Sequence, residues 1–471
     1  MSDKYKNLAS NTAVLMLGQF FSKMLVYIMM RFYTAMLGTG GYGAVGNIID
    51  VSTLAMGIFT LSIGESVIRF ASDIHYDKRK VFTAGIITTV CGAVLFAAFI
   101  PTVSMVSFLH EYAFLIFLYT LTGSVKSTCA LFIRSSGRVK LYAIDGVLTT
   151  AVNIILNIVL LATFNLGVTG YVLSVVFADL FSIVFLTFAA RLWRYVGFRY
   201  IDKPLWNDMF RFCLPLIPTA VMWWVTSVSD SFFVTSIMGV ENAGIYKAAY
   251  KLPSIIALVS GIFSQAWNLS AIGEQHAKDG GRFYTNVFNQ LQSAIYCLAA
   301  GMLLFIKPVL GIMTAGGFEE AYRYTPMLIL AVVFSSFSTF CGSVYIVRKK
   351  TIRSMTTVLF GAVLNLILNA VLIPNFGLNG AAAATLASYL LVFVLRASDT
   401  RRIMKMRLYP AKMVVSIGIL AAMGVVVAKA DGTLYWIELI LLSIPVLLIN
   451  VVPAIHAVIS LRRKPKPKNH R

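Results

Sequence analysis

The stretch GQFFSKMLVYIMMR, from Gly18 to Arg31, lies inside the first long apolar segment of the chain. Polar or charged residues recur in it at every fourth position, at Gln19, Lys23, Tyr27 and Arg31. A spacing of four places them on one side of a helix. Charged side chains in a membrane helix normally face a bundle interior or a water-filled cavity. The stretch therefore predicts a membrane helix whose cationic stripe lines a cavity. The alternative is that Lys23 pairs with a carboxylate in the packed bundle or extends to the membrane surface.

The composition is that of a polytopic helical membrane protein. Of the 471 residues, 58% are hydrophobic and 13% are charged, and the mean hydropathy is +0.80. Soluble proteins carry roughly 25% charged residues. The five cysteines are scattered without paired spacing, so we interpret them as reduced core residues with no metal or disulfide role.

Apolar runs long enough to cross a bilayer as a helix occur fourteen times in the sequence. The sequence therefore predicts an all-α fold of fourteen transmembrane helices. These predicted helices lie near residues 9–36, 46–70, 81–106, 112–133, 142–163, 168–190, 208–237, 244–270, 285–306, 324–346, 354–373, 378–396, 411–429 and 434–460.

Lysine and arginine are concentrated in every second connecting segment. With the N-terminus inside, the predicted inner segments hold 32 of the 40 Lys and Arg residues. Cytoplasmic loops of membrane proteins carry such an excess. We therefore expect both termini to be cytoplasmic, with residues 461–471 forming a basic tail that is solvated or touches anionic lipid. The net charge of +21 then reflects topology. It does not indicate nucleic-acid binding, because no basic stretch is interleaved with aromatic residues.

Two motifs occur twice along the chain. Asn153-Ile-Ile-Leu-Asn157 in the fifth predicted helix matches Asn365-Leu-Ile-Leu-Asn369 in the eleventh, and each is followed by Phe and two glycines. Leu37-Gly38 with Gly43, after the first helix, matches Met238-Gly239 with Gly244, after the seventh. Because each repeat spans six helices, both halves insert in the same orientation. We expect two six-helix lobes, 1–203 and 204–403, related by a pseudo-two-fold axis normal to the membrane, with helices 13 and 14 in 404–460.

Two local sequences carry a family resemblance. The loop Leu37-Gly38-Thr39-Gly40-Gly41-Tyr42-Gly43 is similar to a Leu-Gly…Tyr-Gly turn, and Gly64-Glu65-Ser66-Val67-Ile68-Arg69-Phe70 is similar to a helix ending with Arg and an aromatic residue. Together with the helix count and the repeat, the chain resembles the polysaccharide-flippase branch of the multidrug/oligosaccharidyl-lipid/polysaccharide exporter superfamily.

The resemblance implies a function and a setting. Such proteins flip undecaprenyl-diphosphate-linked oligosaccharides to the outer leaflet of the bacterial cytoplasmic membrane by alternating access between two lobes. The implied partners are the lipid-linked glycan, membrane lipids and polysaccharide-assembly enzymes.

An anionic diphosphate headgroup needs cations along a wet path, and Lys and Arg supply charge-assisted hydrogen bonds to phosphate. The predicted cavity residues lie on the first and eighth helices, which we expect to face each other, one from each lobe: Gln19, Lys23, Arg31, Lys247, Lys251 and Gln265. For Lys247, the alternative is a lysine at the outer membrane surface.

The remaining charges within helices are candidates for structure, coupling or gating. Lys126 and Asp179 either pair within one lobe, or Asp179 takes a coupling proton or Na⁺. Asp230 is expected to pair with Lys247 or Lys251, or to bind an ion.

Position and spacing give expectations for three further sets of polar residues. Glu65 and Arg69, one helical turn apart, predict a salt bridge near the cytoplasmic end of the second helix. Asp50 and Asp145 are expected at membrane surfaces, and the four repeat asparagines are expected to bond between helices.

Nothing in the sequence indicates an enzyme. It has no P-loop, and its five histidines are dispersed, so we expect no cofactor apart from a coupling Na⁺ or H⁺. Two other functions remain: an ion-coupled multidrug or cation antiporter of the same superfamily, and a non-transporting membrane scaffold.

Overall fold

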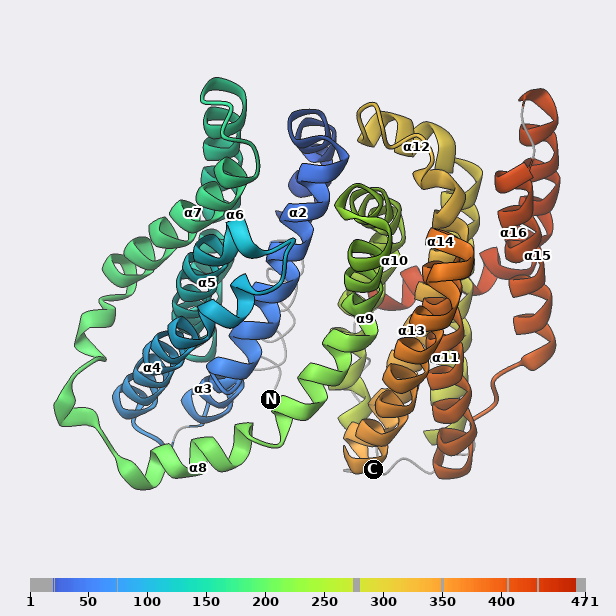
Figure 1. The fold of residues 1–471 in the computed structure, drawn as a ribbon. Helices are drawn as coiled ribbons and strands as arrows, with labels where there is room; N and C mark the ends of the chain where they lie inside the picture. Colours follow the sequence, from blue (N-terminus) through green and yellow to red (C-terminus); the bar gives the residue numbers. More distant parts are fainter. Residues whose placement is uncertain are drawn as a thin grey trace, which may run out of the picture. The chain divides into compact units, whose positions relative to one another are not determined.

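The structure is helical throughout its described part. A computed structural model describes residues 20–273, 280–348, 351–404, 406–429 and 432–462, apart from residues 21 and 74. These residues form fifteen α-helices and no β-strand (Figure 1). Eleven of the helices in this part are long and apolar enough to cross a membrane. The predicted class, an all-α polytopic membrane protein, is confirmed.

The chain divides into two compact units. The first comprises residues 1–247 and 313–317, and the second comprises 248–312 and 318–471. The boundary falls within α10 (Val240–Gly273), so the first unit extends beyond the lobe predicted for residues 1–203. The division into six-helix lobes stays a prediction.

In the first unit, α5 packs against its neighbours α2, α3, α4, α6 and α7. Its core includes Phe82 and Phe132, whose ring centroids lie 4.4 Å apart. The helices of this unit are α2 (Met30–Phe59), α3 (Ile63–Ala71), α4 (Lys78–Ser104), α5 (Ala113–Ser135), α6 (Val139–Asn157), α7 (Gly167–Ala190), α8 (Lys203–Cys213) and α9 (Leu216–Met238).

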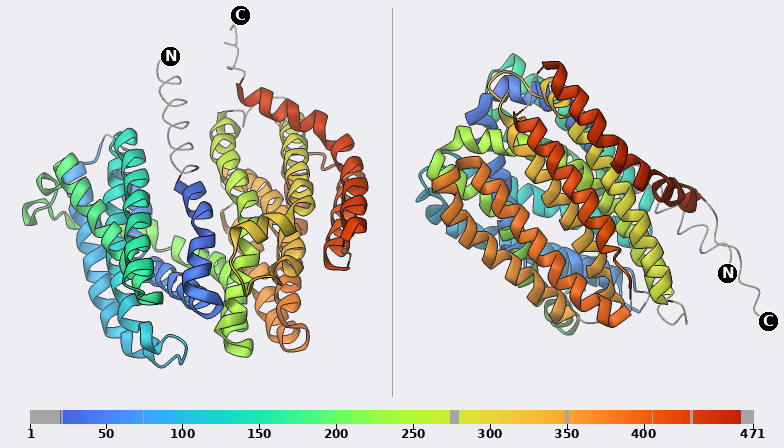
Figure 2. Two further views of the ribbon diagram at one scale, coloured as in Figure 1. Left: turned by 90° about the horizontal axis from the view of Figure 1, so that it is seen from above. Right: turned by 90° about the vertical axis from the view of Figure 1, so that its right-hand side faces the viewer.

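In the second unit, α13 packs along α14 and α11 packs along α16 (Figure 2). Large aromatic side chains fill its core, among them Tyr284, Phe288, Phe337 and Phe340, all almost fully buried. After α10, the helices of this unit are α11 (Gly280–Leu304), α12 (Ile306–Met313), α13 (Ala321–Val347), α14 (Thr351–Met404), α15 (Pro410–Lys429) and α16 (Gly432–Arg462).

Several predicted helices differ from the observed ones in their continuity. The predicted helix 46–70 is interrupted between α2 and α3, where Leu61 and Ser62 have φ values of 55° and 50°. The predicted helix 208–237 is divided into α8 and α9 at Pro215, which precedes the first residue of α9 and has no N–H to continue a helical ladder. Predicted helices 11 and 12 form the two parts of α14, joined by a kink at Gly377. One candidate span therefore covers two predicted helices.

Glycines at equivalent repeat positions adopt the same unusual backbone conformation. Gly38 and Gly239, which are 201 residues apart, have φ values of 64° and 92°. Gly167 and Gly377, which are 210 residues apart, have φ values of 54° and 59°. Positive φ is accessible to glycine without a Cβ penalty. The two halves of the sequence therefore turn between helices by the same device, which supports the repeat.

The paired asparagine motifs also have the same local structure. Asn157 Nδ2 donates to Asn153 Oδ1 at 2.9 Å in α6, and Asn369 Nδ2 donates to Asn365 Oδ1 at 3.2 Å in α14. Ser174 Oγ on α7 also donates to Asn153 Oδ1 on α6 at 3.2 Å, a bond between helices. Each motif thus links two turns of its own helix, a contact that the prediction of interhelical bonding did not include.

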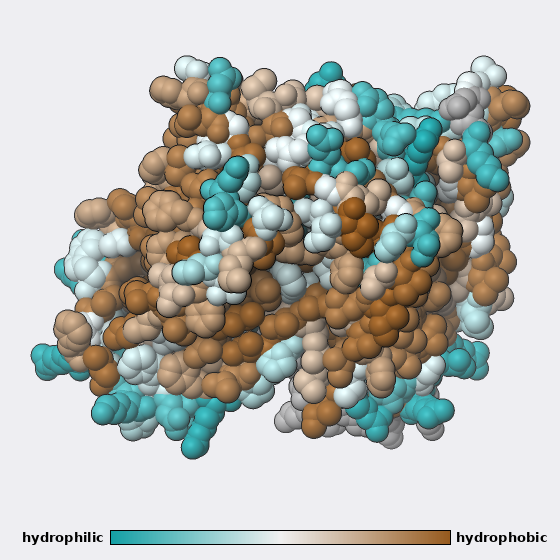
Figure 3. All heavy atoms as spheres, in the orientation of Figure 1, coloured by the Kyte–Doolittle hydropathy of each residue, from teal (hydrophilic) through white to brown (hydrophobic). Residues whose placement is uncertain are grey.

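Large hydrophobic side chains are exposed on many helices, including Val94, Phe188, Val414 and Leu448. Figure 3 shows one face covered mainly by hydrophobic residues, with hydrophilic residues gathered along its lower edge. Extensive exposed apolar surface marks contact with a membrane or a partner. Together with the eleven candidate spans, it makes this a multi-pass membrane protein.

Candidate functional site

Two glycines bring α2 and the start of α10 into close backbone contact. A Cβ atom added to Gly43 would lie 2.2 Å from the carbonyl oxygen of Val240, and one added to Gly244 would lie 2.0 Å from the carbonyl oxygen of Thr39. Residues 39 and 43 are each 201 positions before residues 240 and 244, so the contact is reciprocal between repeat positions. Small residues allow such approaches between membrane helices.

A buried hydrogen-bond group continues this contact one turn along α2. Asn47 Nδ2 donates to Thr235 Oγ1 at 2.9 Å, and Ser231 Oγ donates to Asn47 Oδ1 at 3.2 Å. Asn47 is 1% exposed, and both partners belong to α9. Because buried polar groups need partners, these bonds fix α9 beside α2.

An ion pair lies one further turn along the same face of α2. Lys247 Nζ on α10 binds Asp50 Oδ2, and Trp224 Nε1 on α9 donates to the main-chain oxygen of Asp50 at 2.9 Å. The lysine side chain crosses Gly46, where an added Cβ atom would lie 2.1 Å from Lys247 Cδ. Residues 43, 47 and 50 thus form one stripe on α2, which we call the α2–α9–α10 contact.

Asp50 and Lys247 form a pair that the sequence did not predict. Asp50, which the sequence predicts close to a membrane surface, is half-buried and pairs with Lys247. Asp230, one of the partners considered for Lys247, accepts a hydrogen bond from the Tyr246 hydroxyl at 3.0 Å and is 2% exposed. Asp50 follows Gly43 by two helical turns, and Lys247 follows Gly244 by one turn. Once the two glycines are known to be in contact, this spacing places both charges beside that contact, so it was the sequence signal that could have predicted the pair.

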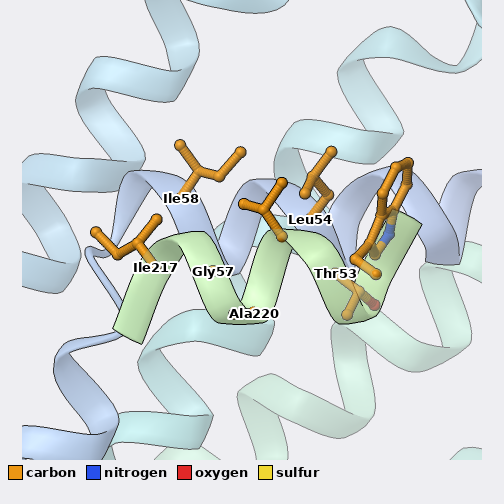
Figure 4. Close-up of a pocket in the computed structure, with 8 residues that line it drawn as sticks. Thr53, Leu54, Gly57, Ile58, Ile217 and Ala220 are labelled. Carbon is orange, nitrogen blue, oxygen red and sulfur yellow. The ribbon is translucent and has the colours of Figure 1, made fainter. Parts of the chain in front are cut away.

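An apolar pocket of about 110 Å³ adjoins this contact between α2 and α9. Figure 4 shows side chains of both helices around it. Trp224, which holds the main chain of Asp50, forms part of its wall. A hydrocarbon group fits such a lining, and the adjacent Lys247 is suited to an anion. The pocket is lined by Thr53, Leu54, Gly57, Ile58, Ile217, Ala220, Val221 and Trp224.

The other predicted cavity residues are not all described. Lys23 lies in the helical residues 22–28 and Arg31 lies in α2, and both are exposed. Lys251 is half-buried on α10. Gln19 and the side chain of Gln265 lie outside the described residues.

A second lysine–aspartate pair lies inside the helices of the first unit. Lys126 Nζ on α5 binds Asp179 Oδ1 on α7 at 2.8 Å, and the Asp179 side chain is 7% exposed.

Asp145 on α6, which the sequence predicts close to a membrane surface, is 2% exposed. It accepts a hydrogen bond from Ser182 Oγ at 2.7 Å. Hydroxyls from α6 and α7 therefore compensate a carboxylate that position in the sequence did not identify as buried.

Glu65 and Arg69, both of which the structure describes, do not form the predicted salt bridge. Both residues are exposed, and Arg69 instead lies 3.7 Å from Asp73. Hydrogen bonds from His75 lower the pKa of the Asp73 carboxyl. An exposed pair one turn apart gains little energy and loses side-chain entropy, so spacing alone did not determine the partner.

Among the residues that the structure describes, no group of three or more His, Cys, Asp or Glu side chains could hold a metal ion. The α2–α9–α10 contact instead combines one cation with an apolar pocket.

Two of the proteins that the chain resembles come from archaea. An uncharacterised membrane protein of Methanocaldococcus jannaschii is 23% identical over 424 residues, which cover 85% of this chain and 99% of the relative. A probable low-salt glycan biosynthesis flippase of Haloferax volcanii is 27% identical over 180 residues, which cover 37% of each chain.

Solved transporter structures share the fold. An outward-facing multidrug resistance MATE family transporter of the MOP superfamily is 15% identical, with a TM-score of 0.59 over 85% of this chain and 96% of that one. A MOP superfamily transporter from Pyrococcus furiosus, described as having a binding pocket of reverse polarity, is 14% identical, with a TM-score of 0.56 over 85% of this chain and 95% of that one.

The profile of the family described as polysaccharide biosynthesis protein matches residues 8–267, more than half of the chain. The matched range includes every residue of the α2–α9–α10 contact. The chain therefore belongs to the polysaccharide biosynthesis protein family, and it shares its fold with the solved transporters above.

Proposed function

We propose that the protein flips a polyprenyl-diphosphate-linked oligosaccharide, with undecaprenyl diphosphate as the expected carrier, across the cytoplasmic membrane. The observation that carries the proposal is the position of Lys247. This cation is half-buried at a contact between segments of the two sequence repeats, and it pairs with Asp50. The main-chain oxygen of Asp50 is bound by Trp224, a residue of the apolar pocket's wall. A lipid diphosphate has the matching chemistry, with an anionic headgroup next to a hydrocarbon chain.

The charge of Lys247 suits a substrate that enters and leaves. Lysine presents a compact charge with three donors, and hydrogen bonds from an ammonium to phosphate are charge-assisted. Lys23, Arg31 and Lys251 are proposed to extend the cationic path. A pocket of about 110 Å³ is somewhat smaller than a cavity of about 150 Å³ that holds benzene, so it suits one branched segment of a polyprenyl chain.

The proposed mechanism is alternating access. Fourteen helices would form two six-helix lobes and a terminal pair, with both termini in the cytoplasm. The energy would come from an ion gradient, with Asp179 or Asp230 as carrier of H⁺ or Na⁺, or from the substrate gradient. Polysaccharide-assembly enzymes would supply the glycan on one side and consume it on the other.

Reconstitution into liposomes tests this function. A fluorescent polyprenyl-diphosphate-linked oligosaccharide is placed in both leaflets, and quenching by external dithionite measures how much lipid crosses. We expect the protein to make nearly all of the label accessible, whereas protein-free liposomes leave the inner half protected. Ion-driven export of a cationic dye without lipid flipping would favour the antiporter. Neither activity would favour the scaffold.

A further inference from the structure

We propose that Asp50 is the resting counter-ion of Lys247, and that the anionic headgroup of the substrate displaces it. This inference rests on the proposed function and adds a switch to it. Lys247 binds either the Asp50 carboxylate or the phosphate of the substrate. The exchange of the carboxylate for the phosphate loosens the α2–α9–α10 contact.

The Lys247–Asp50 pair is accessible at both of its members. The side chains of Lys247 and Asp50 are 14% and 22% exposed, whereas in the other pair Lys126 is 29% exposed and its partner Asp179 only 7%. The difference lies in the carboxylate: Asp50 can give up its lysine and be solvated, whereas Asp179 would be left buried. A phosphate offers more acceptor oxygens than one carboxylate, so it competes for the same three ammonium donors.

The pair depends on a glycine. The Lys247 side chain crosses α2 at Gly46, where an added Cβ atom would lie 2.1 Å from Cδ, 2.6 Å from Cε and 2.7 Å from Nζ. These atoms belong to the end of a flexible side chain, so a methyl group there turns the lysine away without moving the backbone. Gly46 therefore permits the rotamer in which Lys247 reaches Asp50.

The pair lies at the end of the stripe on α2. Asp50 continues the stripe formed by Gly43 and Asn47, and Trp224 of α9 binds its main-chain oxygen. Moving Lys247 to another anion removes the bond from Lys247 on α10 to Asp50 on α2. A ligand shifts a conformational equilibrium only by its differential affinity for the two states. The diphosphate binds better to the state in which Lys247 has left Asp50, so substrate binding itself favours the loosened α2–α9–α10 contact.

The test measures binding of inorganic pyrophosphate and farnesyl diphosphate to the full-length protein in detergent. The apparent dissociation constant equals the intrinsic one divided by the competent fraction. If the ion pair occupies about nine-tenths of molecules, freeing Lys247 tightens binding by up to about tenfold. Gly46→Ala separates Lys247 from Asp50 without changing any charge, and Asp50→Asn breaks the same ion pair by removing the carboxylate.

The controls separate exchange from simple electrostatics. Gly146→Ala on α6 makes the same substitution where an added Cβ atom meets nothing within 4 Å, and should bind like the wild type. Lys247→Gln should weaken binding, and adding Gly46→Ala to it should have no further effect. Thermal unfolding of each variant verifies folding. Gly46→Ala keeps the test decisive even if Asp50→Asn is unstable.

The outcomes distinguish the two proposals. The exchange is supported if Gly46→Ala binds the diphosphates more tightly than the wild type and if this gain is absent from the double variant with Lys247→Gln. Unchanged binding by Gly46→Ala, while Lys247→Gln still weakens it, overturns the exchange but leaves Lys247 as an anion site. If Lys247→Gln binds both diphosphates like the wild type, or the wild type binds neither, the proposed substrate site fails and the exchange fails with it.

Discussion

The two lysine–aspartate pairs of the first unit differ in what they join. Lys126 and Asp179 are 53 residues apart and link α5 to α7 within one predicted lobe. Lys247 and Asp50 are 197 residues apart and link segments from the two sequence repeats. Lys126 is 29% exposed but its partner Asp179 is 7% exposed, whereas Lys247 and Asp50 are 14% and 22% exposed. A pair whose carboxylate is buried inside one bundle suits a fixed structural role, and a pair between repeats whose carboxylate is partly exposed suits exchange with a ligand.

The largest expected effect is on the buried pair. Lys126→Met leaves Asp179 unpaired in the helix bundle, and removing one partner of a buried ion pair costs about 3–5 kcal/mol. The double variant Lys126→Met with Asp179→Leu should recover most of that loss, because replacing both charges with apolar groups is often neutral. Chemical unfolding in detergent measures both. Equal losses in the single and double variants would show that the pair is not the reason for the cost.

The next effect concerns the backbone contact beneath the accessible pair. Gly244→Ala places a methyl group 2.0 Å from the carbonyl oxygen of Thr39, so α2 and α10 must separate. Overpacking of this kind costs about 1–3 kcal/mol. Gly146→Ala, in open space, is the matched control and should remain within about 0.5 kcal/mol of the wild type. An equal stability of the two variants would argue that this contact is already open.

The smallest expected effect on stability is in the accessible pair itself. The interaction energy of Asp50→Asn and Lys247→Gln in a double-mutant cycle should be no more than about 1 kcal/mol, as for partly solvated pairs. The same unfolding assay measures it. A value as large as that of the buried pair would remove the physical basis for exchange with a ligand.

The sequence predicted the helical segments well because apolar length and glycine positions are local signals. Gly38, Gly239 and Gly377 mark turns in the structure as their repeat spacing indicated. The buried position of Asp145 and the pairing of Asp50 were not predicted. Both depend on which helix faces meet, a tertiary property that the order of residues along one helix does not contain.

The central claim is that Lys247 serves an anionic lipid substrate, whereas Lys126 serves the fold. The most direct test is flipping of the fluorescent polyprenyl-diphosphate-linked oligosaccharide by Lys247→Gln, with every variant matched for folded protein in the liposomes. Losing one hydrogen bond to a charged group costs about 1.5–3 kcal/mol. We therefore expect Lys247→Gln to flip the lipid roughly tenfold to a hundredfold more slowly, with a thermal stability close to that of the wild type. Wild-type flipping by Lys247→Gln, or a loss of flipping that only parallels a loss of folded protein, would contradict the claim.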